Sequence, residues 1–356
     1  MREPGRMRIL IVSSYPPRHC GIGAYAHEQA ARLRAEGHEV TVLSPPDGDG
    51  DVRAPFVGGG AFREAAAIGG DFDRIVVHFQ PALYYPPRKA FEKVLTSASL
   101  AWLVLRRRDA TELLIHEADP PIRWRPDYAL LGLAFRAART LAFHTQAERR
   151  AFERAYRMRL CSRGRVRPHV ATAVSPAGAV ARGEARRRLG IAGAPSPVFV
   201  SPGFLQASKG MDRAVDAFAR VFVSGVEGSV PTGEPAASLY LVGSVRDDSA
   251  ENRSYVERLR SRCAEVPGAH LVERFVSEEE FDLWVGAADR IVLAYRRAWS
   301  SGVLARAHEL GTPAIVCDVG GLAEQASGGD VLVEGDEGLV EAFERVRSDA
   351  REGVAR

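Results

Sequence analysis

Three loops of this chain combine glycine, serine and basic residues in the way that anion-binding loops do. They are Ser13–Gly23 (SSYPPRHCGIG), Ser201–Gly210 (SPGFLQASKG) and Arg296–Leu304 (RRAWSSGVL). Each follows an apolar run and leads into a helical pattern, so the free N–H groups of a helix start would face a ligand there. A tight turn or a simple N-cap accounts for any one of them alone. Together they predict phosphate binding, although none has the G-x-G-x-x-G dinucleotide fingerprint.

Lys209 is the strongest single candidate in these loops. It lies at a predicted helix start, where the helix dipole disfavours a cation unless an anion is also present. The chain has 48 Lys and Arg residues, of which only Lys89, Lys93 and Lys209 are lysines. A bias of this strength favours a GC-rich genome and suggests that a retained lysine is one that arginine does not replace. The alternative for Lys209 is an ordinary solvent-exposed side chain.

Histidines and carboxylates follow two of the predicted strands. His116 comes directly after a strand in the segment IHEADPP, with Glu117 and Asp119 near enough to orient it or to meet a hydroxyl group of a ligand. His78 ends an earlier strand and, with Tyr84, could line a ligand pocket, although packing is the more common role for such a tyrosine. A histidine at a strand end also serves often as a structural hydrogen-bonding group.

An acidic D-x-D motif, Asp71–Asp73, resembles a divalent-cation motif in form only. It leads into a strand instead of following one, and ligand sites of open parallel sheets lie beyond the carboxyl ends of the strands. We interpret it as an acidic turn and expect no metal.

The elements that position these residues alternate between strands and helices along almost the whole chain. Continuous apolar runs indicate strands that are buried on both faces, as in parallel sheets. The predicted strands are Ile9–Val12, Val40–Leu43, Ile75–Val77, Leu113–Ile115, Leu141–Phe143, Val198–Val200, Leu239–Val242, Ile291–Ala294, Ala314–Cys317 and Val331–Val333. Helical periodicity predicts helices over Ile22–Leu33, ended by Gly37, over Met211–Phe222 after an N-cap at Ser208, and from Ser300–Ser301 to Gly311. The fold class is therefore α/β.

Two domains follow from this order and from the length of 356 residues. The composition loosens between Thr172 and Pro197, so we place the domains at 1–180 and 181–356, and the last helix could return to the first domain. Two doubly wound domains that face each other would form a cleft at the carboxyl ends of their strands.

Composition excludes several classes of protein. Hydrophobic residues make up 46% and charged residues 26%, as in globular proteins. Ala98–Leu105 is too short for a membrane span, which needs about 20 apolar residues, and the N-terminal apolar run is too short for a signal peptide. The four cysteines are scattered along the chain, which argues against a disulfide framework and favours a reducing compartment. We therefore expect a cytoplasmic protein.

Charge is distributed unevenly. Residues 1–180 hold 27 Lys and Arg against 18 Asp and Glu, a net charge of +9, whereas the remainder has a net charge of −6. The basic half could face an acidic substrate or a membrane surface, or could simply be a solvated face. Lys89, Lys93 and Arg106–Arg108 flank the apolar segment Phe91–Leu105, which predicts either an anionic membrane contact or an ordinary core helix. No nucleic-acid-binding module is visible.

Three long segments together resemble the retaining nucleotide-sugar glycosyltransferases of family 4. These segments are SYPPRHCGIGAYAHEQAARLRAEGHEVTVL, PGFLQASKGMDRAVDAFARV and SSGVLARAHELGTPAIVCDVGGLAEQ, and they span nearly the whole chain in the family's order. The resemblance implies a GT-B fold of two Rossmann-like domains facing across a cleft. It also implies that the first domain binds the acceptor and that the second binds a nucleotide-diphosphate sugar.

The resemblance further implies site residues. His116 is expected beside the donor sugar and Lys209 at its phosphates, both in catalytic roles. Two departures stand out: the family's basic residue three positions before the lysine is Gln206 here, and its paired glutamates, the second of which holds the ribose, are Ala298 and Arg306. The expected donor-binding residues are Gly21, Gly23, Gln206, Lys209, Ser301, Gly302, Val303 and Arg306; the expected acceptor-binding residues are His78, Tyr84, Glu117 and Asp119.

The mechanism that the resemblance implies is retaining hexosyl transfer without a metal ion, by front-face attack. The leaving diphosphate would help to deprotonate the acceptor hydroxyl, and the protein would position the substrates and stabilise charge. A small molecule is the leading acceptor, with a lipid-linked one as the alternative. Two other functions remain open: a catalytically lapsed partner subunit, which the absent glutamates favour, and a sugar-nucleotide epimerase of the same fold.

Overall fold

The computed structural model describes residues 5–18, 20–85, 89–117, 121–122, 124–169, 180–223, 235–245 and 249–354, with side chains to residue 350. Contacts divide the chain into two compact units, Met1–Pro168 and His169–Arg356. The sequence analysis placed its boundary after residue 180; residues 170–179 lie outside the described residues. We describe each unit by itself.

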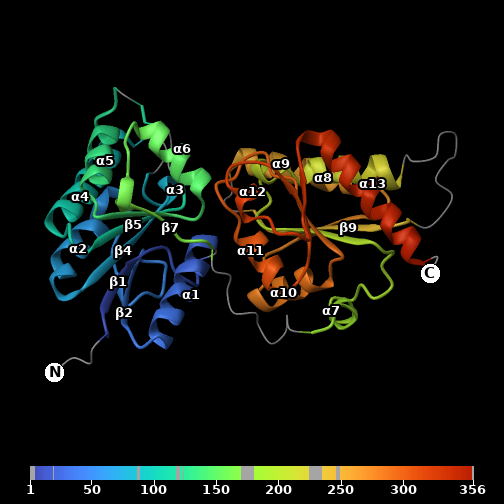
Figure 1. Ribbon diagram of the computed structural model, residues 1–356, viewed down its shortest axis with the longest axis horizontal. Coiled ribbons are helices and arrows are strands. Elements are labelled where there is room, and N and C mark those ends of the chain that lie inside the picture. The colour runs from blue at the N-terminus through green and yellow to red at the C-terminus, as the bar shows by residue number, and fades with distance from the viewer. Residues whose placement is uncertain are drawn as a thin grey trace. The chain divides into compact units, whose positions relative to one another are not determined.

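Unit 1 is built on a parallel sheet with the strand order β3-β2-β1-β4-β5-β6-β7. The order reverses on either side of β1, as in doubly wound folds (Figure 1). The strands are β1 (Arg8–Val12), β2 (Glu39–Ser44), β3 (Val52–Arg53), β4 (Arg74–Phe79), β5 (Thr111–Ile115), β6 (Thr140–Phe143) and β7 (Gly164–Val166).

Helices cover both faces of this sheet. On one face, Ala26, Ala30 and Leu33 of α1 pack against alternate residues of the central strands, such as Ile9 and Ile11. Helix α4 packs against α2 and α5 to form a second layer. The helices are α1 (Gly21–Ala35), α2 (Gly60–Ile68), α3 (Pro81–Tyr84), α4 (Ala90–Arg106), α5 (Pro126–Ala137) and α6 (Gln146–Tyr156).

Unit 2 repeats the plan with the strand order β10-β9-β8-β11-β12-β13. Here the order reverses at β8, so the loops after β8 and β11 leave from neighbouring strands. The strands are β8 (Val198–Pro202), β9 (Ser238–Gly243), β10 (Ala269–Glu273), β11 (Arg290–Leu293), β12 (Ala314–Cys317) and β13 (Val331–Val333).

Two apolar clusters lie on opposite faces of this second sheet. Phe199 and Leu239 pack with α8, α9 and α13, whereas Val200 and Tyr240 pack with α10 and α11. Figure 1 shows α8 and α13 on one side of β9 and α10 on the other. The helices are α7 (Arg182–Arg188), α8 (Met211–Phe222), α9 (Ala250–Glu265), α10 (Glu278–Ala287), α11 (Gly302–Glu309), α12 (Leu322–Gln325) and α13 (Gly335–Val354).

Helix termini test the sequence signals directly. Ser301 caps α11 as predicted, because its Oγ accepts a hydrogen bond from Leu304 N at 3.2 Å. The prediction of Ser208 as the cap of α8 is wrong: the residue before that helix is Gly210, in the left-handed region at φ 61°. The last helix, α13, packs on α8 within unit 2, and its return to the first domain stays a prediction.

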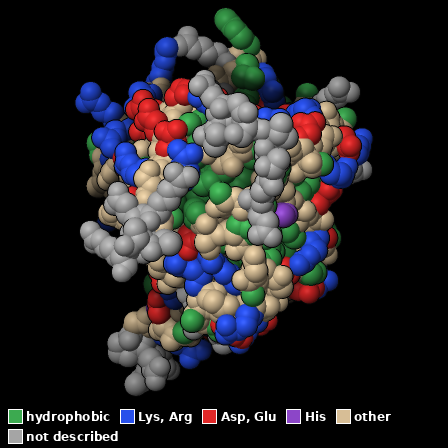
Figure 2. Space-filling view, turned by 90° about the vertical axis from the view of Figure 1, so that its right-hand side faces the viewer, with side chains coloured by type: hydrophobic (Ala, Val, Ile, Leu, Met, Phe, Trp, Pro, Cys, Tyr) green, Lys and Arg blue, Asp and Glu red, His purple; other side chains and the backbone are tan. Residues whose placement is uncertain are grey.

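Acidic and basic side chains lie interspersed on the face of the molecule shown in Figure 2. Unit 2 also has exposed ion pairs, among them Arg220 with Glu337 and Arg260 with Glu273. Over the ranges that the structure describes, we find no helix with the length and apolar character needed to cross a membrane.

Candidate functional site

The loops after β8 and β11 meet at one edge of the unit 2 sheet. Arg296 N donates to Ser208 O at 2.9 Å, which ties the two loops together through their backbones. Gly210 lies so close to the second loop that a Cβ there would be 2.0 Å from Ala294 O. This contact, as well as the positive φ, requires glycine directly after Lys209.

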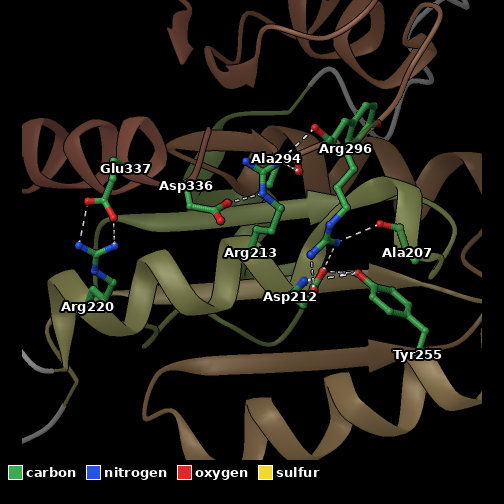
Figure 3. Close-up of polar contacts among 10 residues, drawn as sticks. Ala207, Asp212, Arg213, Arg220, Tyr255, Ala294, Arg296, Asp336 and Glu337 are labelled. Carbon is green, nitrogen blue, oxygen red and sulfur yellow. Dashed lines mark hydrogen bonds and ion pairs between the residues drawn. The ribbon is translucent and has the colours of Figure 1, made fainter. Parts of the chain in front are cut away.

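An ion pair fixes the same junction through side chains (Figure 3). Arg296 donates two hydrogen bonds to the carboxylate of Asp212, at 2.7 and 2.6 Å, and a third to Ala207 O at 3.0 Å. Tyr255 OH donates to Asp212 Oδ1 at 2.9 Å. Burial acts to raise the pKa of Asp212, but the hydrogen bonds from Arg296 and Tyr255 hold it below its usual value.

Arg213 adds a second connection, from the first turn of α8 (Figure 3). Its Nη1 donates to Ala294 O at 3.0 Å and to Tyr295 O at 3.2 Å, while its Nε pairs with Asp336. The sequence analysis missed these partners because they are more than 80 residues apart in the chain. The available signal was an arginine in the loop after β11, Arg296, and charged residues in the first turn of the helix that follows β8, Asp212 and Arg213.

Lys209 lies over the ring of Tyr295, with Nζ 3.9 Å from the ring centroid. Tyr295 is 1% exposed, so the ring in this cation–π contact is buried and shielded from water. The Tyr295 hydroxyl lies 3.4 Å from Ser301 Oγ. One buried tyrosine thus links the lysine to the start of α11, and the structure brings these two predicted site regions together.

The start of α11 is held in place from behind. Gln325 Oε1 accepts from Ser301 N at 2.7 Å, and Ser301 is itself buried. Gly302 is exposed, and a Cβ there would meet nothing within 4 Å. The helix therefore begins at an exposed residue, and the N–H groups of Gly302 and Val303 at such a helix start have anion-binding geometry. Gln206 precedes the short 3-10 turn Ala207–Lys209 on the neighbouring loop.

Arg306 has another role than the expected donor contact. Its guanidinium is buried and donates to both carboxylate oxygens of Asp282, at 2.5 and 2.8 Å, and Asp282 is fully buried. A charge that is paired in this way is costly to withdraw from its partner. We therefore assign Arg306 to the interior of unit 2 and leave it out of the donor site. Ala298, at the other glutamate position, packs against the apolar cluster that Val200 and Tyr240 form with α10 and α11.

In unit 1, the loop after β1 contains buried hydroxyls. Ser13 and Ser14 are 0% exposed, and within the described part of the chain neither Oγ has a hydrogen-bond partner. Gly23 lies against this loop, since a Cβ there would be 3.2 Å from Ser14 Oγ, whereas the position at Gly21 is open. Unpaired buried hydroxyls at the start of the 15-residue helix α1 are consistent with a polar ligand here.

His78 and Tyr84 do not line a pocket. Both side chains are 0% exposed; Tyr84 OH donates to His78 O at 2.9 Å and its ring stacks on Phe56 and Phe62. Without exposed surface they have no face for an acceptor, so we assign both to the interior. Asp73 is likewise structural, because its carboxylate accepts from Arg8 N at the amino ends of the strands.

His116 is partly exposed at the end of β5, as predicted. Its ring lies between two other histidines: Nε2 is 3.3 Å from His78 Nδ1, and Nδ1 is 3.2 Å from His144 Nε2. Glu117, the next residue, accepts from Gln80 Nε2 at 3.1 Å. The predicted acceptor residue Asp119 lies outside the described residues. The sequence analysis missed His144, although it too directly follows a strand.

Several solved structures are similar to this one over nearly the whole chain. The chain is similar to HepE (Alr3699) of Anabaena in complex with UDP, at 16% identity with a TM-score of 0.66 over 97% of this chain and 91% of that one. It is also similar to the sucrose-phosphate synthase of Thermosynechococcus elongatus, at 18% identity with a TM-score of 0.69 over 97% of this chain and 90% of that one. A third similar structure is a UDP-forming trehalose-phosphate synthase from Burkholderia xenovorans, at 14% identity with a TM-score of 0.67 over 96% of this chain and 91% of that one. The fold is therefore GT-B, as predicted.

One sequence family matches part of the chain. Residues 196–349, most of unit 2, match the family described as glycosyl transferases group 1. No curated protein matches by sequence. The match and the fold together support a glycosyltransferase of the GT-B class.

Proposed function

We propose that this protein transfers a hexosyl unit from a nucleotide-diphosphate sugar to an acceptor hydroxyl, with retention of configuration and without a metal ion. The observation that carries the proposal is the junction of Lys209 with the start of α11, in the unit that matches the glycosyltransferase family. A lysine ammonium and free helix N–H groups at one place form a site for a diphosphate. Both would stabilise the charge that develops on this group as it leaves.

The donor site consists of residues from both loops of the junction. We assign Gln206, Lys209, Ser301, Gly302 and Val303 to it, with Gly21 and Gly23 of unit 1 at the donor phosphates or the acceptor. Glu117 stays the acceptor candidate among the described residues. HepE was crystallised with UDP and with UDP-glucose, so UDP-glucose is the first donor to test.

Donor turnover tests this proposal. Purified full-length protein is incubated with UDP-, ADP-, GDP- and TDP-sugars, with and without EDTA, and release of nucleoside diphosphate is measured together with the anomeric configuration of the product. We expect release with one donor, unchanged by EDTA, and a retained configuration. Diphosphate binding without turnover for any donor and acceptor would instead favour the lapsed partner subunit. A 2-epimerised or eliminated sugar would favour the epimerase.

We predict that His116→Ala lowers turnover more than it weakens nucleotide binding, because we assign His116 to the sugar and Lys209 to the phosphates. Calorimetry with the free nucleoside diphosphate and steady-state kinetics are the two measurements. A matched control is His38→Ala, since His38 is a unit 1 histidine that contacts Met7 N at the amino end of β1. A large loss of diphosphate affinity in His116→Ala would place His116 at the phosphates instead.

An exposed apolar stripe on α4 favours a lipid surface as the place of the acceptor. Phe91 (79% exposed), Leu95, Trp102 (45%) and Leu105 (54%) follow the spacing i, i+4, i+11 and i+14, which places them on one helix face. A different set of apolar residues on α4, including Leu100, Leu103 and Val104, is buried. The expectation of an ordinary core helix is thus correct for one face only.

We propose that this stripe docks on an anionic membrane. Exposed Val57 lies on the turn beside α4, and exposed Leu133 lies on the adjoining helix α5. Lys89 and Arg106 flank the stripe at either end of α4, and unit 1 is basic overall. Apolar side chains beside basic ones are the combination that binds anionic bilayers.

Vesicle flotation checks this prediction. At low salt the protein is expected to float with phosphatidylglycerol vesicles and not with phosphatidylcholine vesicles. Binding should weaken as salt rises, since charge attraction is screened within about 10 Å at 0.1 M. Phe91→Ser with Trp102→Ser should abolish flotation, whereas Leu332→Ser, an exposed apolar residue of unit 2, should not. Concentration-dependent dimerisation that the double variant abolishes, with no vesicle binding, would assign the stripe to a second copy of the chain.

A further inference from the structure

Three histidines form a continuous hydrogen-bonded row across the sheet of unit 1. His78, His116 and His144 stand at the carboxyl ends of β4, β5 and β6, which are neighbouring strands. Their nitrogens are 3.3 and 3.2 Å apart from ring to ring. The row ends at Gln29 Oε1, 2.9 Å from His78 Nε2, and at Arg167 O, 3.0 Å from His144 Nδ1.

The Arg167 end determines the direction of every hydrogen bond in the row. A carbonyl oxygen only accepts, so His144 Nδ1 carries a proton. When His144 is neutral, its Nε2 is an acceptor, so His116 Nδ1 must carry a proton and donate to it. The tautomer of His116 is therefore set by a backbone carbonyl two strands away.

The Gln29 end determines how many protons the row holds. With Gln29 Oε1 facing His78, a neutral His78 must donate from Nε2, and its Nδ1 must then accept from His116 Nε2. His116 in this arrangement carries protons on both ring nitrogens. The three rings then hold four protons, one more than three neutral rings hold; a Gln29 amide turned to donate its NH₂ group would correspond to the neutral row.

Burial determines which ring bears the charge. His78 is 0% exposed and His144 is 2% exposed. Burial lowers the pKa of His78 to about 3, with a further contribution from His144, and lowers that of His144 to about 4. His116 alone is partly exposed. The extra proton therefore belongs to His116, whose two neighbours both accept from it.

We propose that His78 and His144 are positioning residues that hold His116 as the protonated ring of this row, and that the resulting imidazolium is the form active in transfer. The second half of this proposal rests on the proposed function. With both nitrogens engaged, His116 would act on the substrate through its positive charge and the edge of its ring.

Other groups around the row contribute to its electrostatics. The Tyr25 ring lies with its centroid 5.4–5.6 Å from all three histidine rings, and burial raises the pKa of its hydroxyl. Charged residues that interact with Tyr25 or with groups of the row and its neighbours, among those described, include Glu28 and Arg32 on α1, Glu112 on β5, Glu117 after it, Glu148 on α6 and Arg167 after β7. The variants below leave all of them unchanged.

Nitrogen-15 NMR of histidine side chains in the full chain tests the row without substrate. At the acid end of a titration from pH 5 to pH 8, we expect His116 protonated on both nitrogens, His144 on Nδ1 and His78 on Nε2. The two buried rings should not titrate in this range, so a histidine titration seen there is assigned to His116. A His144 ring protonated on Nε2, or titration of His78 or His144 in this range, would overturn the proposal.

Substitutions at the two ends shift the His116 titration in opposite directions. Gln29→Glu supplies a stronger acceptor and should move the His116 midpoint to higher pH. His144→Phe removes the acceptor for Nδ1–H and should move it to lower pH, while His144→Gln keeps an acceptor and a donor and should restore it. Circular dichroism controls for folding. An unchanged midpoint in folded Gln29→Glu and folded His144→Phe contradicts the proposal.

The activity measurement tests the second half. The alkaline limb of the kcat profile should follow the His116 midpoint, moving up in Gln29→Glu and down in His144→Phe. At neutral pH His144→Phe should lower kcat by about 10- to 100-fold, the range known for partners that orient metal-binding histidines, with KM little changed. A limb that stays in place rejects the imidazolium as the active form. Absence of turnover with every donor would overturn the proposed function and, with it, the imidazolium as the active form. The NMR measurement would still test the protonation of the three histidines.

Discussion

Lys209→Ala is expected to reduce transfer by about 10²–10³-fold, the scale for losing one preorganised group that stabilises transition-state charge. The fold should be unaffected, because the side chain lies over the Tyr295 ring without an ion-pair partner among the described residues. The junction is held by other contacts, namely Arg296 with Asp212 and Arg213 with Ala294. Steady-state kinetics at subsaturating donor and a thermal melt are the measurements.

Two further variants sharpen this prediction. Arg260→Ala removes an exposed cation that pairs with Glu273 in unit 2, and it should leave kcat/KM unchanged. Lys209→Arg keeps the charge but replaces a compact ammonium with a planar fork, and it should recover only part of the activity. Wild-type turnover in Lys209→Ala would exclude a role for Lys209 at the diphosphate.

Arg306→Met is expected to lower the free energy of unfolding by about 3–5 kcal/mol, the range for removing one partner of a buried ion pair. The substitution removes the guanidinium that pairs with the carboxylate of Asp282 in the interior of unit 2, where both residues are buried. Chemical denaturation followed by circular dichroism and by the fluorescence of Trp284, which lies on the same helix as Asp282, measures the loss.

The partner substitution separates charge from volume. Arg306→Met combined with Asp282→Leu should recover most of the stability, because replacing both members of a buried pair with apolar residues is often neutral. Arg220→Ala, which breaks an exposed pair with Glu337, should have little effect. A fully stable Arg306→Met single variant would mean that Arg306 is free to contact the donor, as the resemblance first suggested.

The strands show how far the apolar pattern predicts this fold. Every predicted strand is present within one or two residues of its predicted ends, and the three that were missed, β3, β7 and β10, lie at the edges of the two sheets. A central strand is buried on both faces and needs a continuous apolar run, whereas an edge strand does not. The segment AHLVE of β10 is partly exposed for this reason.

The site shows the limit of spacing arguments. Lys209, Ser301 and His116 were recognisable because each stands directly after a strand or at a helix start. His78, Tyr84 and Arg306 have equally suggestive positions but are buried. Local sequence does not distinguish a polar residue that faces a ligand from a polar residue that is paired with another buried group. The reason is that the partner of such a buried residue lies far away in the chain.

The amino-acid sequence by itself determined the βα order, the two-sheet plan and the loops that lead from β1, β8 and β11 into helices. These features depend on apolar periodicity and on glycine or serine at helix ends, which are local properties. Only the tertiary structure decided that Lys209 lies on Tyr295, that Arg306 belongs to Asp282 and that three histidines join in one row. Such pairings depend on which strands become neighbours in the sheet, and strand order brings together residues that are distant in the chain.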